Sequence, residues 1–104
     1  MGHLALADTP ATLDIPVYKV VSGIPVMAET FVFRLTAENN APMPAGSVNG
    51  VKTVTITGTG NTTFGTITYT TVGDYTYTIS EAAGTSGDYV YDTTVYDVTV
   101  QVTW

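Results

Sequence analysis

The sequence predicts an all-β sandwich, and three observations support this prediction. Threonine, valine and tyrosine are abundant, and these residues favour strands. Apolar and polar residues alternate in six short segments, which are separated by turn-forming Gly, Pro, Asn and Asp. No window carries apolar residues at helical spacing, so almost no helix is expected. This pattern is typical of two packed sheets of short antiparallel strands.

The size and charge of the chain indicate one domain and exclude two classes of partner. At 104 residues it is long enough for one domain with a single core. A net charge of −6 argues against nucleic acid and anionic membrane surfaces as partners, because both attract clusters of Lys and Arg. No apolar run has the length of a transmembrane helix. There is no cysteine, and the scattered carboxylates and the single histidine, His3, predict no metal site and no cofactor.

The first strand is predicted over Leu13–Val21. Residues 1–12 are interpreted as a leader added for expression or as a flexible N-terminus, and residues 13–104 as a single domain. Pro16 has no N–H to donate to a neighbouring strand, so it restricts this strand to a sheet edge or occupies the strand's start.

Five more strands are predicted after the first. The segment between the second and third strands is rich in Asn, Pro and Gly and is predicted to be a long surface loop. The sequence stops directly after its most amphipathic strand, which would leave an unpaired edge, so a closing strand is expected to be missing. The five strands are predicted at Thr30–Thr36, Val51–Thr57, Phe64–Thr71, Tyr75–Glu81 and Thr94–Trp104.

Two charged residues stand on apolar strand faces. Lys19 shares a face with Val17 and Val21, because side chains alternate along a strand. Glu81 shares a face with Ile79 in the same way. Burying an unpaired charged group costs several kcal/mol of folding free energy, so each of these residues must be paired, neutral or exposed to water. The lysine has the alternative of snorkelling to the surface, and the glutamate that of turning into solvent at its strand end.

Five segments of the chain carry a recognisable pattern when they are taken in order: VYKVVSG at Val17–Gly23, ETFVFRL at Glu29–Leu35, FGTITY at Phe64–Tyr69, GDYTYTISE at Gly73–Glu81 and YDTTVYDVTV at Tyr91–Val100. Together they resemble a Gram-positive pilin isopeptide-linkage domain, and the similarity extends from about Ile15 to Trp104. Such domains are similar to the B-type repeats of collagen adhesins. The resemblance therefore implies an immunoglobulin-like sandwich of the kind stacked in pili and surface stalks.

The resemblance also implies a covalent crosslink made by the domain itself. In that family, a lysine on the first strand and an asparagine on the last strand form a spontaneous isopeptide bond, which a carboxylate on a central strand catalyses. By motif, the lysine is Lys19 and the carboxylate is Glu81. The chemistry agrees, because burial favours the neutral forms of an amine nucleophile and of a carboxyl acid. The alternative is a buried salt bridge without chemistry.

The acceptor asparagine of the family has no counterpart in this chain, and by the resemblance it should follow Trp104. The chain is therefore interpreted as a truncated or split "catcher" form. Its expected partner is a peptide that supplies the last strand with an Asn or Asp, or a neighbouring domain of the same pilus. The asparagines that are present are all predicted in loops or turns: Asn39, Asn40, Asn49 and Asn61.

The implied function is that of a structural shaft or stalk domain of a pilus or surface adhesin. Its place is outside the cell, on the wall of a Gram-positive bacterium. Bond formation occurs once per molecule, so the domain is not a conventional enzyme. The alternative is a non-crosslinking adhesive module in which exposed tyrosines such as Tyr18 bind carbohydrate or host protein. Lys52, the other lysine, is expected to be a solvated surface residue.

Overall fold

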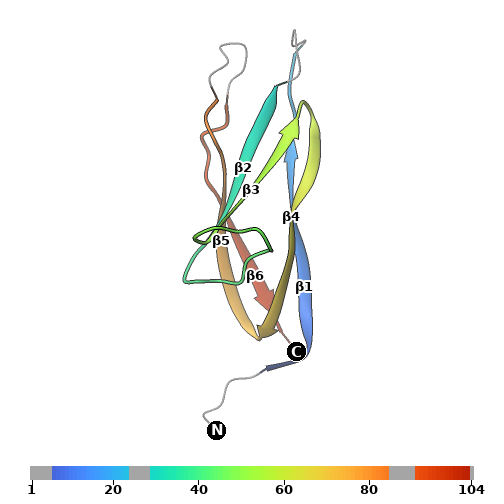
Figure 1. The fold of residues 1–104 in the computed structure, drawn as a ribbon, viewed down its shortest axis with the longest axis vertical. Coiled ribbons are helices and arrows are strands. Elements are labelled where there is room, and N and C mark those ends of the chain that lie inside the picture. The colour runs from blue at the N-terminus through green and yellow to red at the C-terminus, as the bar shows by residue number, and fades with distance from the viewer. Residues whose placement is uncertain (1–5, 24–28, 85–90, 104) are drawn as a thin grey trace.

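The computed structural model is an elongated β-sandwich of two sheets (Figure 1). The structure describes residues 6–23, 29–84 and 91–103. Within these ranges there is no helix, and hence none long and apolar enough to cross a membrane. The strands are β1 (Leu6–Lys19), β2 (Thr30–Ala37), β3 (Val51–Thr57), β4 (Gly60–Thr71), β5 (Gly73–Glu81) and β6 (Tyr96–Val102).

The two sheets differ in size. One consists of β1 and β4, and the other has the order β3-β2-β5-β6. All pairs are antiparallel, and short turns join β3 to β4 and β4 to β5. Figure 1 shows the β1–β4 pair along one side of the molecule and the four-stranded sheet along the other. The predicted all-β sandwich is therefore confirmed.

Several strand boundaries differ from the prediction. β1 begins at Leu6 rather than at Leu13 and ends at Lys19 rather than at Val21. Its first half pairs with β4, with a register shift between Leu6 and Ala11. The start of β1 therefore depends on pairing with a strand distant in sequence, which the local sequence pattern does not show. β4 likewise begins at Gly60 rather than at Phe64.

Alternation along the strands builds the core between the sheets. Phe31, Phe33 and Leu35 on β2 are all buried, as their spacing predicts. Each such side chain contributes about 1.5–3 kcal/mol when it is removed from water. The buried core consists of Ile15, Val17, Phe31, Phe33, Leu35, Ala41, Ile56, Phe64, Ile67, Tyr69, Tyr77 and Val102.

The inward face of β6 is only partly covered. Val102 is buried, whereas Val98 and Val100 are partly buried against the core. Strand alternation puts Tyr96 on this same face, but it is 51% exposed because it lies at the start of the strand, beside an open groove. Trp104, which ends the predicted strand Thr94–Trp104, lies outside the described residues.

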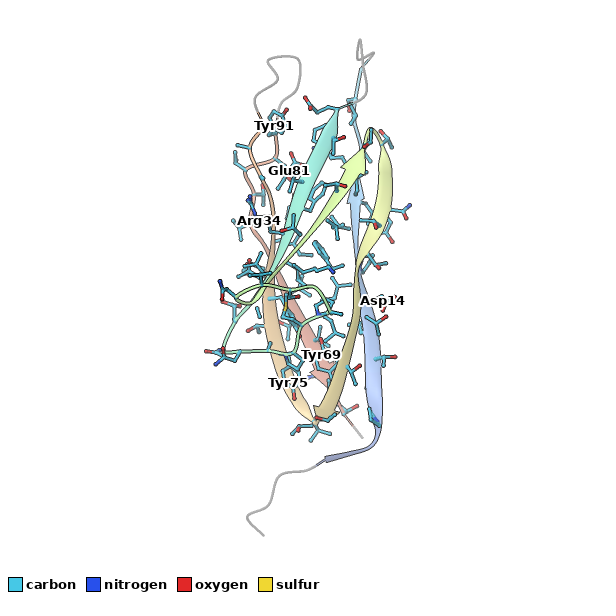
Figure 2. All side chains as sticks on the ribbon, in the orientation of Figure 1. Asp14, Arg34, Tyr69, Tyr75, Glu81 and Tyr91 are labelled. Atoms are coloured by element: carbon cyan, nitrogen blue, oxygen red, sulfur yellow. The ribbon has the colours of Figure 1, made fainter. Side chains whose placement is uncertain are left out.

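Two buried tyrosine hydroxyls anchor the loop between β2 and β3. Tyr77 donates to the carbonyl oxygen of Pro42 at 2.7 Å, and because this uses its one proton, Tyr69 donates to Tyr77, also at 2.7 Å. Burial raises the pKa of both hydroxyls. Tyr69 and Tyr75 lie toward the opposite end of the sandwich from Glu81 (Figure 2).

The tyrosine pair makes stability sensitive to alkaline pH. The pKa values are raised in the folded state, so their stabilising effect is complete below the unfolded value of about 10 and is lost as the pH rises toward the folded values. We expect Tyr77→Phe to lower the free energy of unfolding by about 1–2 kcal/mol at neutral pH and to make the alkaline decline shallower. Urea unfolding at several pH values measures both effects. Tyr18→Phe, on a side chain that is 69% exposed, is the control, and an equal loss in both variants would contradict this role.

Candidate functional site

Lys19 is the last residue of β1 and points into the sandwich. Ile15 and Val17, four and two positions before it, are buried, and the lysine side chain follows their face with 13% exposure. Its Nζ lies 4.4 Å from the centroid of the Phe31 ring, a distance suited to a cation–π contact. The side chain therefore does not snorkel to the surface.

Glu81 is the last residue of β5 and meets Lys19 between the two sheets. It lies opposite Phe33 of β2 in the strand register, and its side chain is only 2% exposed. The Lys19 Nζ is 2.8 Å from Glu81 Oε2. The structure thus brings the two predicted site residues together although 62 positions separate them in sequence.

A third residue, Asp92, completes the surroundings of the carboxylate. Its main-chain N–H donates to Glu81 Oε1 at 3.0 Å. Its own carboxylate accepts from the Thr94 N–H at 2.9 Å and from the Tyr96 hydroxyl at 2.6 Å. The Tyr96 hydrogen bond is the main reason that the pKa of Asp92 lies below its ordinary value. Sequence reasoning missed this residue, although Asp is a residue type whose side chain often accepts from the main-chain N–H two positions on and so forms such a turn.

A groove of about 410 Å³ opens beside these residues. Its walls come from the end of β1, the end of β5 and the segment that leads into β6, and Lys19, Glu81 and Asp92 all line it. A second groove, of about 290 Å³, lies between the earlier part of β1 and the end of β6. Both grooves lie beside β1 and β6. In the described ranges each of these strands is paired along one edge only, β1 with β4 and β6 with β5. Of the two positions that Pro16 allowed, a sheet edge or a strand start, the structure has the sheet edge, since Pro16 lies well inside β1.

The other candidate groups lie elsewhere. Lys52 donates to the carbonyl oxygen of Ala45 at 2.6 Å, outside the groove. Asn61 lies within β4 and not in a turn as predicted. No asparagine is among the described residues that line the groove, and no group of three His, Cys, Asp or Glu side chains in the described ranges suits a metal ion. The remaining asparagines, Asn39, Asn40 and Asn49, are exposed in the loop between β2 and β3.

The geometry suits proton exchange between an amine and a carboxyl. At 2.8 Å the ammonium proton of Lys19 has a direct path to Glu81 Oε2, and the product is a neutral amine beside a neutral acid. The lone pair of the amine then lies at the edge of an open groove, where an incoming carbonyl group has room.

The fold and the site together define the class of this protein, an immunoglobulin-like sandwich with a lysine–glutamate pair enclosed between its sheets. The model of the FctA family, described as a Spy0128-like isopeptide-containing domain, matches residues 15–103. The chain therefore belongs to this family, as the sequence resemblance predicted. Domains of this family are structural pilin domains and cell-surface components of pili, not classical enzymes. No curated protein matches the chain.

Proposed function

We propose that this chain is a shaft or stalk domain of a Gram-positive pilus or surface adhesin that forms an isopeptide bond through Lys19. The acceptor is an Asn or Asp on a strand that adds to the free edge of β1, and in a split arrangement this strand arrives as a separate peptide. The observation that carries the proposal is the Lys19–Glu81 contact of 2.8 Å at the wall of an open groove.

The free edge of β1 presents backbone groups for such a strand. Successive residues of a strand direct their N–H and C=O groups to alternate edges. Just past the end of β1, the Val21 N–H donates to the Thr59 hydroxyl in the turn before β4. Counting back with the same alternation, we infer that the backbone groups of Lys19 face β4 and those of Tyr18 face the free edge. Pro16 falls on that free edge too, where its missing N–H costs no bond to β4.

An added strand brings its acceptor next to Lys19. Residues opposite one another on neighbouring strands have their side chains on the same face, whichever way the strands run. The residue opposite Lys19 therefore points between the sheets, toward the amine and Glu81. Backbone hydrogen bonds and burial of apolar side chains in the two grooves provide the docking energy.

The covalent step balances without a cofactor. Glu81 takes a proton from the Lys19 ammonium, and the neutral Nζ attacks the side-chain carbonyl carbon of the acceptor. The new bond joins Nζ to that carbon, and the bond from the carbon to the amide nitrogen of Asn breaks. Glu81 returns the proton to the leaving nitrogen and ammonia departs, and the Glu81 carboxylate then takes the second proton from the Lys19 nitrogen; with Asp the leaving molecule is water. Contact between docked groups removes a penalty of roughly 7–11 kcal/mol in well-oriented cases.

Peptides that copy the last strand of other FctA-family domains, each with a single Asn, test the proposal. We expect the chain to form an adduct that survives boiling in denaturant. Its mass should equal the sum of chain and peptide less one ammonia, and peptide mapping should place the bond at Lys19. Lys52→Ala should react like the wild-type chain, because Lys52 is held at Ala45 outside the groove. An adduct at Lys52, or no adduct with any such peptide, would contradict the proposal.

Tyr18 favours a second function, that of an adhesive module without a crosslink. Its side chain is 69% exposed and lines the groove, a suitable position for an aromatic contact with carbohydrate or host protein. The same mass measurement separates the two functions, because an adhesive module binds without losing ammonia.

A further inference from the structure

We propose that Asp92 is a positioning residue that fixes the orientation of the Glu81 carboxylate, so that Oε2 exchanges the proton with Lys19. This inference rests on the proposed function and assigns a role to a residue outside the lysine–glutamate pair. It starts from the 3.0 Å hydrogen bond that the main-chain N–H of Asp92 donates to Glu81 Oε1.

The position of this N–H is set by the Asp92 side chain. One carboxylate oxygen accepts from the Thr94 N–H at 2.9 Å, which closes a tight turn over Asp92, Thr93 and Thr94. The other oxygen accepts from the Tyr96 hydroxyl at 2.6 Å, which ties the turn to the first residue of β6. The turn is therefore anchored to a strand that is itself paired with β5, the strand that carries Glu81.

The contact makes the two oxygens of Glu81 different. A hydrogen bond donated to one oxygen of a carboxylate stabilises negative charge on that oxygen. Once Lys19 has given up its proton, Oε1 still accepts from the Asp92 N–H, whereas Oε2 lies 2.8 Å from a neutral amine, so Oε2 is the better site for the proton. The proton from Lys19 therefore stays on the side of the carboxyl group that faces the amine and the groove.

The contact also limits the motion of the carboxylate. Both oxygens of the Glu81 carboxylate accept hydrogen bonds, Oε2 from Lys19 and Oε1 from Asp92. When Lys19 becomes neutral and bonds to the acceptor carbon, its contact with Oε2 is lost, and the hydrogen bond from Asp92 to Oε1 remains. Proton return to the leaving nitrogen needs the carboxyl group to stay in place at that moment.

The rate of adduct formation as a function of peptide concentration tests this role. We expect Asp92→Ala to lower the limiting rate roughly tenfold or more, since the main-chain N–H of residue 92 remains but the side-chain contacts to Thr94 and Tyr96 no longer hold it against Glu81 Oε1. The peptide concentration that gives half the limiting rate should stay near the wild-type value, because the free edge of β1 is unchanged. Tyr96→Phe should cause a smaller decrease in the limiting rate.

A conservative replacement and a matched control sharpen the test. Asp92→Asn keeps an oxygen that accepts from the Thr94 N–H, so we expect it to restore most of the rate lost in Asp92→Ala. Asp97→Ala removes an exposed carboxylate from the same strand region, outside the groove, and should react at the wild-type rate. Equal rates for wild type, Asp92→Ala and Tyr96→Phe would overturn the inference and leave the proposed function intact.

Hydrogen exchange at the amide of residue 92 gives a readout that does not depend on the crosslink. We expect this amide to be protected in the wild-type chain and to exchange faster in Glu81→Ala and in Asp92→Ala. A wild-type chain that forms no adduct would refute the proposed function and the catalytic part of this inference. Unchanged exchange in Glu81→Ala would refute the contact itself, whatever the adduct measurement shows.

Discussion

Replacing Glu81 with alanine should stop adduct formation while leaving the docking of the strand peptide nearly unchanged. Without the carboxylate, the Lys19 ammonium has lost the partner 2.8 Å away that accepts its proton, and the leaving nitrogen has no acid. Docking depends on backbone bonds at the β1 edge and on burial of apolar side chains in the grooves; Glu81 lines one groove, but its carboxylate supplies neither backbone bonds at that edge nor apolar surface. Denaturing gels measure the adduct, and fluorescence anisotropy of a labelled peptide measures reversible binding.

Two further variants separate proton transfer from packing. Glu81→Gln keeps the shape of the side chain and should be as inactive as the alanine variant, because an amide does not shuttle protons at neutral pH. Glu38→Ala, at an exposed glutamate just after β2, should react like the wild-type chain. Normal crosslinking in Glu81→Gln would remove Glu81 from the proton-transfer mechanism. Loss of binding together with loss of reaction would show that Glu81 acts through the fold.

The inward orientation of Lys19 and Glu81 could be predicted from sequence, because it depends only on the alternation of side chains along a strand. Alternation in Tyr75–Glu81 and along the first strand is sufficient to place Glu81 and Lys19 on inward faces, and the structure has both side chains there. The distance between them is not a property of either strand. It follows from the stacking of the β1–β4 pair on the four-stranded sheet, which only the tertiary structure reveals.

The part that sequence does not predict depends on backbone conformation outside the strands. Asp92 contributes its main-chain N–H, which every residue except proline has, so its type gives no direct sign of this contact. The exposure of Tyr96 likewise follows from its place at the start of β6 and beside the groove. Strand alternation predicts the orientation of side chains only within a regular strand. Asp92 precedes β6 and Tyr96 is its first residue, so alternation does not predict their contacts.

The structure also raises the question of why the chain keeps a buried lysine–glutamate pair. A buried ion pair is weak evidence for a stabilising role, because removing two charges from water costs about as much as their attraction returns. Apolar residues of similar volume at the same positions are often neutral or stabilising. A pair retained for chemistry and a pair retained for stability therefore predict different results when both residues are replaced.

Replacing both members of the pair should restore stability that a single replacement removes. Lys19→Met leaves the Glu81 carboxylate, with a side chain 2% exposed, without its cation, and we expect it to lower the free energy of unfolding by about 3 kcal/mol. Lys19→Met combined with Glu81→Leu removes both charges and should return the chain to wild-type stability or above. Glu81→Leu alone should cost less than Lys19→Met, because Lys19, at 13% exposure, lies closer to solvent.

Urea unfolding of the four proteins at neutral pH gives the two single effects, the double effect and the coupling energy between the sites. A double variant that is as stable as the wild type but forms no adduct indicates that the pair is kept for the crosslink. A double variant that is as unstable as Lys19→Met would contradict this, since it would mean that the charges themselves hold the sheets together. In that case Lys19 and Glu81 form a structural salt bridge, and the isopeptide proposal loses its strongest support.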